Sequence, residues 1–209
     1  MKNISLIDFG AGNLHSVYKA LKFIGADVEI TSDPNIIEKS SAVVFPGVGA
    51  FGAVINDIKK SNLKEVIIKQ AKSSKPFLGI CVGMQVLFEY SEENPKEKGL
   101  GIFKGKVVRF KKAKKVPHIG WNDVTFCGTK TTKCHPEQSE GSPNTNKFYF
   151  VHSYYVVPED KNIIFAETDY DGERFTSIIK KGNLLAVQFH QEKSGNSGLE
   201  LLSQFTKSI

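Results

Sequence analysis

The sequence predicts an α/β fold with a mostly parallel central sheet, flanking helices and antiparallel hairpins toward the C-terminus. In the first half, short apolar runs alternate with amphipathic segments, which is typical of repeated strand–helix units. After Gly99 the pattern changes to closely spaced strand-like runs separated by turn residues such as Asp171-Gly172. A chain of 209 residues with 40% hydrophobic residues is long enough for one such domain, so we expect residues 1–209 to form it.

Four strands, each followed by a helix, are expected in the first half. The apolar runs that predict these strands are residues 4–9, 28–31, 42–45 and 77–80. The first helix is capped by Asn13 and ends at Gly25, and the second begins at Asp33-Pro34, because proline suits the first helical position. A third helix covers residues 54–73 and a fourth follows Cys81. Ligands of such sheets bind beyond the carboxyl ends of the strands.

The second half is expected to form hairpins and one closing helix. Its strand-like runs are residues 102–110, 122–126, 147–157, 163–169, 175–180 and 184–190. Gly182-Asn183 supplies a further turn, and residues 198–207 form an amphipathic helix. Residues 129–146 contain almost no apolar side chains, so we expect a flexible surface insertion there.

Charge and cysteine content exclude several classes of protein. The net charge is +6, and residues 104–115 are rich in lysine, but Val107 and Phe110 alternate with the charges as in a half-solvated strand, and no nucleic-acid recognition motif accompanies them. Three irregularly spaced cysteines favour a reducing cytoplasm over a disulfide framework. No apolar run suits a membrane span, and Met1 leads into a strand rather than a signal peptide. Without a CxxC pair no zinc site is expected, and no cofactor is predicted.

The stretch Gly79-x-Cys81-x-Gly83 is the strongest candidate for chemistry. It is a Gly-x-nucleophile-x-Gly elbow with sulfur in place of oxygen, at the point where a strand turns directly into a helix. The glycines relieve crowding around the strained central residue, and unpaired N–H groups at a helix start favour thiolate over thiol. The alternative is a buried structural cysteine at the end of a strand.

Two glycine-rich turns precede the elbow. Gly10-Ala11-Gly12 resembles part of a dinucleotide fingerprint, but the third glycine is replaced by His15, so we discard that hypothesis. The loop at residues 46–52 holds three glycines, which leave backbone N–H groups unshielded, as an oxyanion hole requires. A plain flexible turn is the alternative for this loop.

A cysteine nucleophile needs a histidine base with an orienting group, and two histidines have a glutamate two positions on. His135-Pro136-Glu137 lies in polar sequence that offers no rigid support. His190-Gln191-Glu192 follows an apolar strand, where the strand period places His190 and Glu192 on one side. Rigid support favours His190 as the base. His152, in an apolar strand, is expected to be a core residue or a neighbour of the site.

These motifs together resemble the class I (triad) glutamine amidotransferases. Within that class, four separated stretches are similar to the glutaminase subunits of imidazole glycerol phosphate synthase, and the resemblance covers nearly the whole chain except residues 129–146. The stretches are Ile7-Asp8-Phe9-Gly10-Ala11-Gly12-Asn13-Leu14, Pro46-Gly47-Val48-Gly49-Ala50-Phe51, His118-Ile119-Gly120-Trp121-Asn122 and Phe148-Tyr149-Phe150-Val151-His152-Ser153-Tyr154.

The resemblance implies a role for each matching residue. Cys81 would attack the glutamine carboxamide, His190 would act as base and then acid, and Glu192 would hold the imidazole. Residues implied to supply the oxyanion hole are Val82, Gly47 and Val48, and those implied to bind the substrate are Gly49, Gln85, Glu93, Ser153 and Tyr154. Glu92 adjoins Glu93 and competes for its role.

Two features depart from the family pattern. Gln191 stands where the family usually has proline, which removes a backbone constraint between base and orienter. The insertion at residues 129–146 has no family counterpart, so its His-Pro-Glu is interpreted as a coincidental copy.

The resemblance also implies a partner, a (βα)₈-barrel cyclase subunit that uses the released ammonia to make imidazole glycerol phosphate and AICAR in histidine biosynthesis. We expect a heterodimer whose docking face includes Trp121, Asn122, Tyr149 and Lys193. Three alternatives stay open: a glutaminase of another synthase, a PfpI-type cysteine hydrolase, and a binding module without catalysis.

Overall fold

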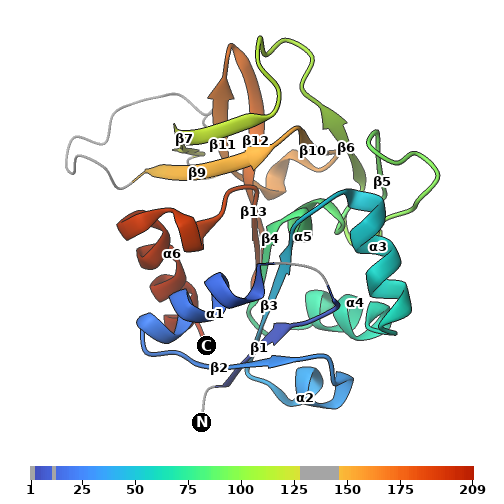
Figure 1. Ribbon diagram of the computed structural model, residues 1–209, viewed down its shortest axis with the longest axis vertical. Helices are drawn as coiled ribbons and strands as arrows, with labels where there is room; N and C mark the ends of the chain where they lie inside the picture. The colour runs from blue at the N-terminus through green and yellow to red at the C-terminus, as the bar shows by residue number, and fades with distance from the viewer. Residues whose placement is uncertain (1–2, 11–12, 128–145) are drawn as a thin grey trace.

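The computed structural model describes residues 3–10, 13–127 and 146–209 (Figure 1). An eight-stranded sheet forms its centre, in the order β2-β1-β3-β4-β13-β12-β11-β8. The strands from β2 to β13 are parallel and the remaining ones antiparallel, as the sequence predicts. The strand bounds are β1 Asn3–Ile7, β2 Asp27–Thr31, β3 Ala42–Gly47, β4 Phe77–Cys81, β8 Thr125–Phe126, β11 Ile164–Tyr170, β12 Glu173–Lys181 and β13 Leu184–Val187.

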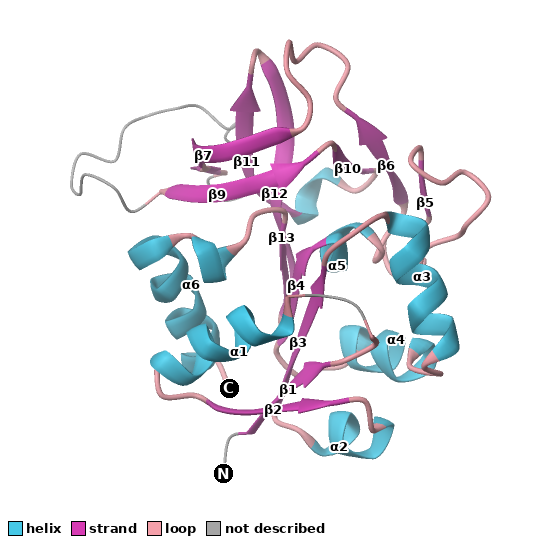
Figure 2. Cartoon of the chain, viewed as in Figure 1, coloured by secondary structure: helices cyan, strands magenta, loops and turns pink. Residues whose placement is uncertain are grey.

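Helices cover both faces of the parallel half (Figures 1 and 2). Helices α1 and α6 contact each other on one face, and α3 and α4 lie on the other. Strands β3 and β4 are therefore apolar along their whole length, as expected for strands whose two faces are both covered by helices. The helix bounds are α1 Leu14–Phe23, α2 Pro34–Lys39, α3 Phe51–Lys60, α4 Lys64–Lys72, α5 Val82–Gln85 and α6 Gly195–Lys207, with 3₁₀ turns η1 Lys161–Ile163 and η2 Gln191–Lys193.

Two small sheets sit over the carboxyl ends of the parallel strands (Figure 1). One contains β10 (Tyr154–Pro158), β6 (Gly105–Arg109) and β5 (Tyr90–Ser91), and the other pairs β7 (His118–Asp123) with β9 (Lys147–His152). The predicted Asp171-Gly172 turn joins β11 to β12 with positive φ at both residues, 53° and 77°, as a tight hairpin requires.

The structure corrects several predicted elements. The single helix predicted over residues 54–73 is two helices, because Asn62 adopts φ 57° between them. The strand predicted over 147–157 breaks at Ser153, and the one over 122–126 divides into the end of β7 and β8. The helix after Cys81 is a single turn, so Leu87 and Phe88 lie beyond it although both are fully buried. Asn13 holds the cap position of α1 without a side-chain capping bond.

Two apolar clusters hold the layers together. The larger one packs the parallel strands against the helices, and the smaller one is rich in phenylalanine and lies beneath β7 and β9. Among residues 3–10, 13–127 and 146–209, no helix combines the length and apolar character needed to cross a membrane.

Candidate active site

Strand register brings the predicted chemistry to one edge of the sheet. Gly47 at the end of β3 pairs with Cys81 at the end of β4, and Val187 of β13 pairs with Ile80 on the other side. The residues that follow Val187 therefore leave the sheet directly beside Cys81, and His190 is among them. Parallel pairing at the carboxyl edge thus explains how a residue near the C-terminus reaches the elbow.

The elbow at Cys81 is strained and closely packed. Cys81 has φ 55° and ψ −114°, a conformation that non-glycine residues rarely adopt. Glycine is required at position 83, because a Cβ there would lie 2.3 Å from the backbone oxygen of Phe45. Since α5 is one turn long, its macrodipole contributes less than the sequence suggested, and donors from side chains matter more.

His190 and Glu192 form a buried pair beside the cysteine. His190 Nδ1 lies 2.8 Å from Glu192 Oε1, and the two side chains are 3% and 1% exposed. Burial alone would lower the pKa of His190, but hydrogen bonds to Cys81 and to Glu192 raise it to about 10. At neutral pH the imidazole is therefore protonated and placed between a sulfur and a carboxylate.

These residues open onto a cavity of about 330 Å³. Its wall holds Cys81 and His190 together with most of the residues predicted to bind substrate or oxyanion. The lining residues are Val48, Gly49, Cys81, Val82, Gln85, Glu93, Pro117, Val151, His152, Ser153, Tyr154 and His190. Gly47 is not among them, since it ends β3 opposite Cys81 and the backbone of Gly83 occupies the place where a side chain at Gly47 would lie.

The two adjacent glutamates have different surroundings. Glu93 lines the cavity, and its Oε2 accepts a hydrogen bond of 2.8 Å from the backbone N–H of Phe51 at the start of α3. Glu92 instead accepts from the N–H of Arg109 at 3.1 Å, on β6 outside the cavity wall. Geometry therefore favours Glu93 as the residue that can reach a ligand.

Sequence reasoning missed part of this wall. Pro117 and Val151 line the cavity and carry no chemical signal of their own, and their place depends on the pairing of β7 with β9. His152, expected to be a core residue or a neighbour of the site, is both, since it is 6% exposed and lines the cavity. Gln188, fully buried next to Cys81, was not singled out at all.

A family model for class-I glutamine amidotransferases matches residues 5–209. The Pyrococcus furiosus imidazole glycerol phosphate synthase subunit HisH is 49% identical over 99% of this chain and 100% of its own. The chain belongs to the HisH family of class-I glutamine amidotransferases. Two further relatives support this assignment. The HisH subunit from Aromatoleum aromaticum is 48% identical over 98% of each chain, and the one from Aquifex aeolicus is 45% identical over 97% of this chain and 95% of its own. The family predicted from the motifs is confirmed.

Solved structures support the fold class of this HisH family member. A crystal structure of a glutamine amidotransferase has a TM-score of 0.71 at 16% identity and covers 99% of both chains. The structure of PurLQS from Thermotoga maritima has a TM-score of 0.70 at 17% identity, over 100% of this chain and 99% of that one. At such identities the likeness concerns the fold alone, and the predicted α/β class is confirmed.

Gln191, the departure from the family's usual proline, is buried between base and orienter. It is 1% exposed, and both of its side-chain polar atoms lack a hydrogen-bond partner in the described chain. It opens the 3₁₀ turn η2, and the hydrogen bond between His190 and Glu192 forms without the proline.

The residues expected to face a partner lie together around β7 and β9. Trp121 is 56% exposed, and its ring lies 6.1 Å from that of Tyr149, its partner in the strand register. The carbonyl of Tyr149 accepts from the N–H of His190 at 2.9 Å, so this small sheet is bonded directly to the predicted base. The second His-x-Glu copy, at His135 and Glu137, lies outside the described residues.

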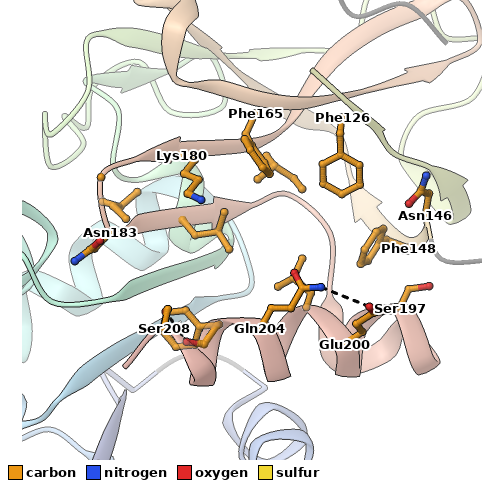
Figure 3. Close-up of a pocket in the computed structure, with 16 residues that line it drawn as sticks. Phe126, Asn146, Phe148, Phe165, Lys180, Asn183, Ser197, Glu200, Gln204 and Ser208 are labelled. Carbon is orange, nitrogen blue, oxygen red and sulfur yellow. Dashed lines mark hydrogen bonds between the residues drawn. The ribbon is translucent and has the colours of Figure 1, made fainter. Parts of the chain in front are cut away.

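A larger hollow of about 580 Å³ lies elsewhere, between α6 and strands β11 to β13 (Figure 3). Phe148 and Phe165 point into it, with Lys180 and Gln204 at its sides. It contains neither the cysteine nor the histidine of the elbow site, so size is a poor guide to the reactive centre here. No group of three or more potential metal ligands occurs in the described parts of the chain.

Proposed function

We propose that the chain hydrolyses L-glutamine to glutamate and ammonia, with Cys81 as nucleophile. The observation that carries this proposal is the meeting of Cys81 and His190 in the wall of one cavity, with Glu192 bonded to the imidazole at 2.8 Å. Cys81 adds to the carboxamide carbon, and His190 gives its proton to the departing ammonia. Neutral His190 then takes a proton from water, which cleaves the thioester to glutamate and restores the thiolate.

The negative oxygen of the tetrahedral intermediate needs two donors. We assign one to the Val82 N–H and the other to an N–H of the loop from Gly47 to Gly49, after a peptide flip in that loop. Gly49 has φ 108°, a conformation accessible to glycine, and both Val48 and Gly49 line the cavity. Each well-placed donor of this kind contributes about 10²–10³ in rate.

The amino-acid end of the substrate is assigned to the far wall of the cavity. The Glu93 carboxylate and the Gln85 side chain suit an ammonium group, and backbone groups of Gly49, Ser153 and Tyr154 suit the carboxylate and amino groups. Both protons of the Gln85 amide are already donated within the protein, which leaves its oxygen as an acceptor for the ammonium.

We further propose that the ammonia passes to a (βα)₈-barrel cyclase subunit in a cytoplasmic heterodimer, which makes imidazole glycerol phosphate and AICAR. The relatives are named as subunits of imidazole glycerol phosphate synthase, which supports the assembly. A docking face is available at the exposed Trp121 beside Tyr149, together with Asn122 and Lys193. Ammonia released into water at neutral pH is mostly protonated, so a glutaminase without a second substrate site must dock onto the enzyme that consumes it.

The test is co-purification with the cyclase subunit followed by glutaminase assays. We expect the isolated chain to be a poor glutaminase and turnover to rise at least about tenfold when the cyclase and its nucleotide substrate are added, since partner binding completes the oxyanion hole. Trp121→Glu should abolish co-elution, whereas Phe23→Glu, at an aromatic that is 79% exposed on α1, should not. Equal turnover with and without partner would refute the coupling, and absence of co-elution would refute the assembly.

A further inference from the structure

Two buried glutamines connect Cys81 to the substrate-binding wall. Gln188 follows β13 and is fully buried, and Gln85 ends α5 and is 3% exposed. Gln85 Nε2 lies 3.0 Å from Gln188 Oε1, and Gln188 Nε2 lies 3.7 Å from Cys81 Sγ, within hydrogen-bonding range for sulfur. The other proton of the Gln85 amide goes to the backbone oxygen of Tyr154 at 2.9 Å.

The Tyr154 carbonyl fixes the direction of each hydrogen bond in the series from Tyr154 through the two glutamines to Cys81. A carbonyl oxygen only accepts, so Gln85 must turn its NH₂ group toward it. The same NH₂ group donates to Gln188, so Gln188 must present its oxygen to Gln85 and its own NH₂ to Cys81. The sulfur therefore faces a donor, and the amide of Gln188 has no alternative orientation that satisfies both neighbours.

Two buried histidines hold the same carbonyl from the other side. His152 Nδ1 donates to Tyr154 O at 2.9 Å, so its Nε2 accepts from His118 Nδ1 at 3.2 Å. Asn122 Nδ2 lies 3.4 Å from His118 Nε2 and donates to Asp169 O at 2.8 Å. Burial lowers the pKa of His152 to about 3 and that of His118 to about 4, so both imidazoles are neutral at ordinary assay pH and this polarity holds.

We infer that Gln188 is a positioning residue for the nucleophile, holding Cys81 Sγ through an N–H···S hydrogen bond that favours thiolate over thiol. A hydrogen bond to a charged acceptor is about twice as strong as one to a neutral acceptor, so the contact is stronger once the proton has left the sulfur. His190 faces the same sulfur, and the one-turn helix α5 adds little. The role of this hydrogen bond in catalysis rests on the proposed glutaminase function, whereas the hydrogen bond itself can be tested without it.

The test measures the rate of alkylation of Cys81 by iodoacetamide as a function of pH, with the Cys81 peptide followed by mass spectrometry. This readout requires neither glutamine nor a partner, so it stands whether or not glutamine is the substrate. Gln188→Met removes the donor at similar size, and Gln188→Glu keeps the acceptor for Gln85 while replacing the donor that faces sulfur. Gln70→Met is the matched control, because Gln70 is also buried, at 3% exposed, but lies on α4.

We expect the wild type and Gln70→Met to react alike. Gln188→Met should react about tenfold more slowly at pH 6.5 and regain the wild-type rate at high pH, since one charge-assisted hydrogen bond is lost. Gln188→Glu should lose at least as much, because it adds like charge next to the thiolate. A slower rate at every pH would indicate damaged packing instead, and an unchanged profile would show that Gln188 does not act on the sulfur. Either result overturns the inference.

Discussion

Replacing Gln191 by proline should stabilise the protein without changing its chemistry. Gln191 is 1% exposed, and its amide nitrogen and oxygen make no hydrogen bond in the described chain. A buried polar group without a partner costs about 1–3 kcal/mol. The position also suits proline, since it opens a 3₁₀ turn and such turns generally have φ near that of proline. His190 before it is extended, with φ −100° and ψ 96°, as a residue preceding proline should be.

The magnitude follows from three contributions. Proline reduces the entropy of the unfolded chain by about 0.4–1 kcal/mol, and removing the unpaired amide adds about 1–3 kcal/mol. The smaller side chain leaves a gap of two heavy atoms, and each missing group of about the size of a CH₂ costs about 0.8 kcal/mol. The net gain is about 1 kcal/mol, which for a chain of this length raises Tm by about 2–4 °C.

Differential scanning calorimetry of the wild type, Gln191→Pro and Gln191→Met tests this reasoning. The methionine variant removes the amide and keeps the length of the side chain, so it isolates the desolvation effect and should also be stabilised. Glutaminase activity of Gln191→Pro should stay within twofold of wild type, because the hydrogen bond between His190 and Glu192 is already formed. A lower Tm in both variants would show that the amide of Gln191 is hydrogen-bonded in the folded protein and would refute the predicted gain in stability.

Four further predictions concern the site. His190→Asn should lose nearly all glutaminase activity while His135→Ala, or excision of residues 130–145, keeps most of it; the reverse pattern would identify the other histidine as the base. The turnover number at saturating glutamine should stay flat from pH 6.5 to 9 and fall near 10, where His190 loses the proton it gives to ammonia. A decline as the pH rises through 6.5 would contradict the raised pKa of His190. Protonated His190 should also contribute fully to the free energy of unfolding below pH 6.5, and this contribution should be lost as the pH rises toward 10. Gly83→Ala should destabilise the fold by about 1–3 kcal/mol, because its Cβ would lie 2.3 Å from the oxygen of Phe45, and an unchanged denaturant midpoint would refute this packing.

Sequence predicted what depends on local pattern. The elbow at Cys81 could be recognised because glycines at fixed spacing report a strained turn, and the Asp171-Gly172 turn because only certain residues tolerate positive φ. His190 could be preferred over His135 because rigid support can be inferred from an apolar strand. These features need only a few neighbouring residues.

What could not be predicted depends on pairing between distant segments. His118 and His152 face each other because β7 and β9 pair in that register, which no short stretch encodes. Gln188 is an ordinary polar residue at the end of a strand until β4 and β13 are placed side by side. The break at Asn62 was missed because the amphipathic pattern continues across it although the helical conformation of the backbone does not.

The central claim is that Cys81 is the nucleophile of a glutaminase, and the most direct measurement is glutamate release by the Cys81→Ala variant in complex with the cyclase subunit. Loss of a triad nucleophile costs several orders of magnitude in rate, so we predict release at or near the background without enzyme. The variant should keep the Tm of the wild type within a few degrees and still bind its partner, because the side chain is small and the elbow glycines are retained. Glutamate release within tenfold of the wild type would contradict the account.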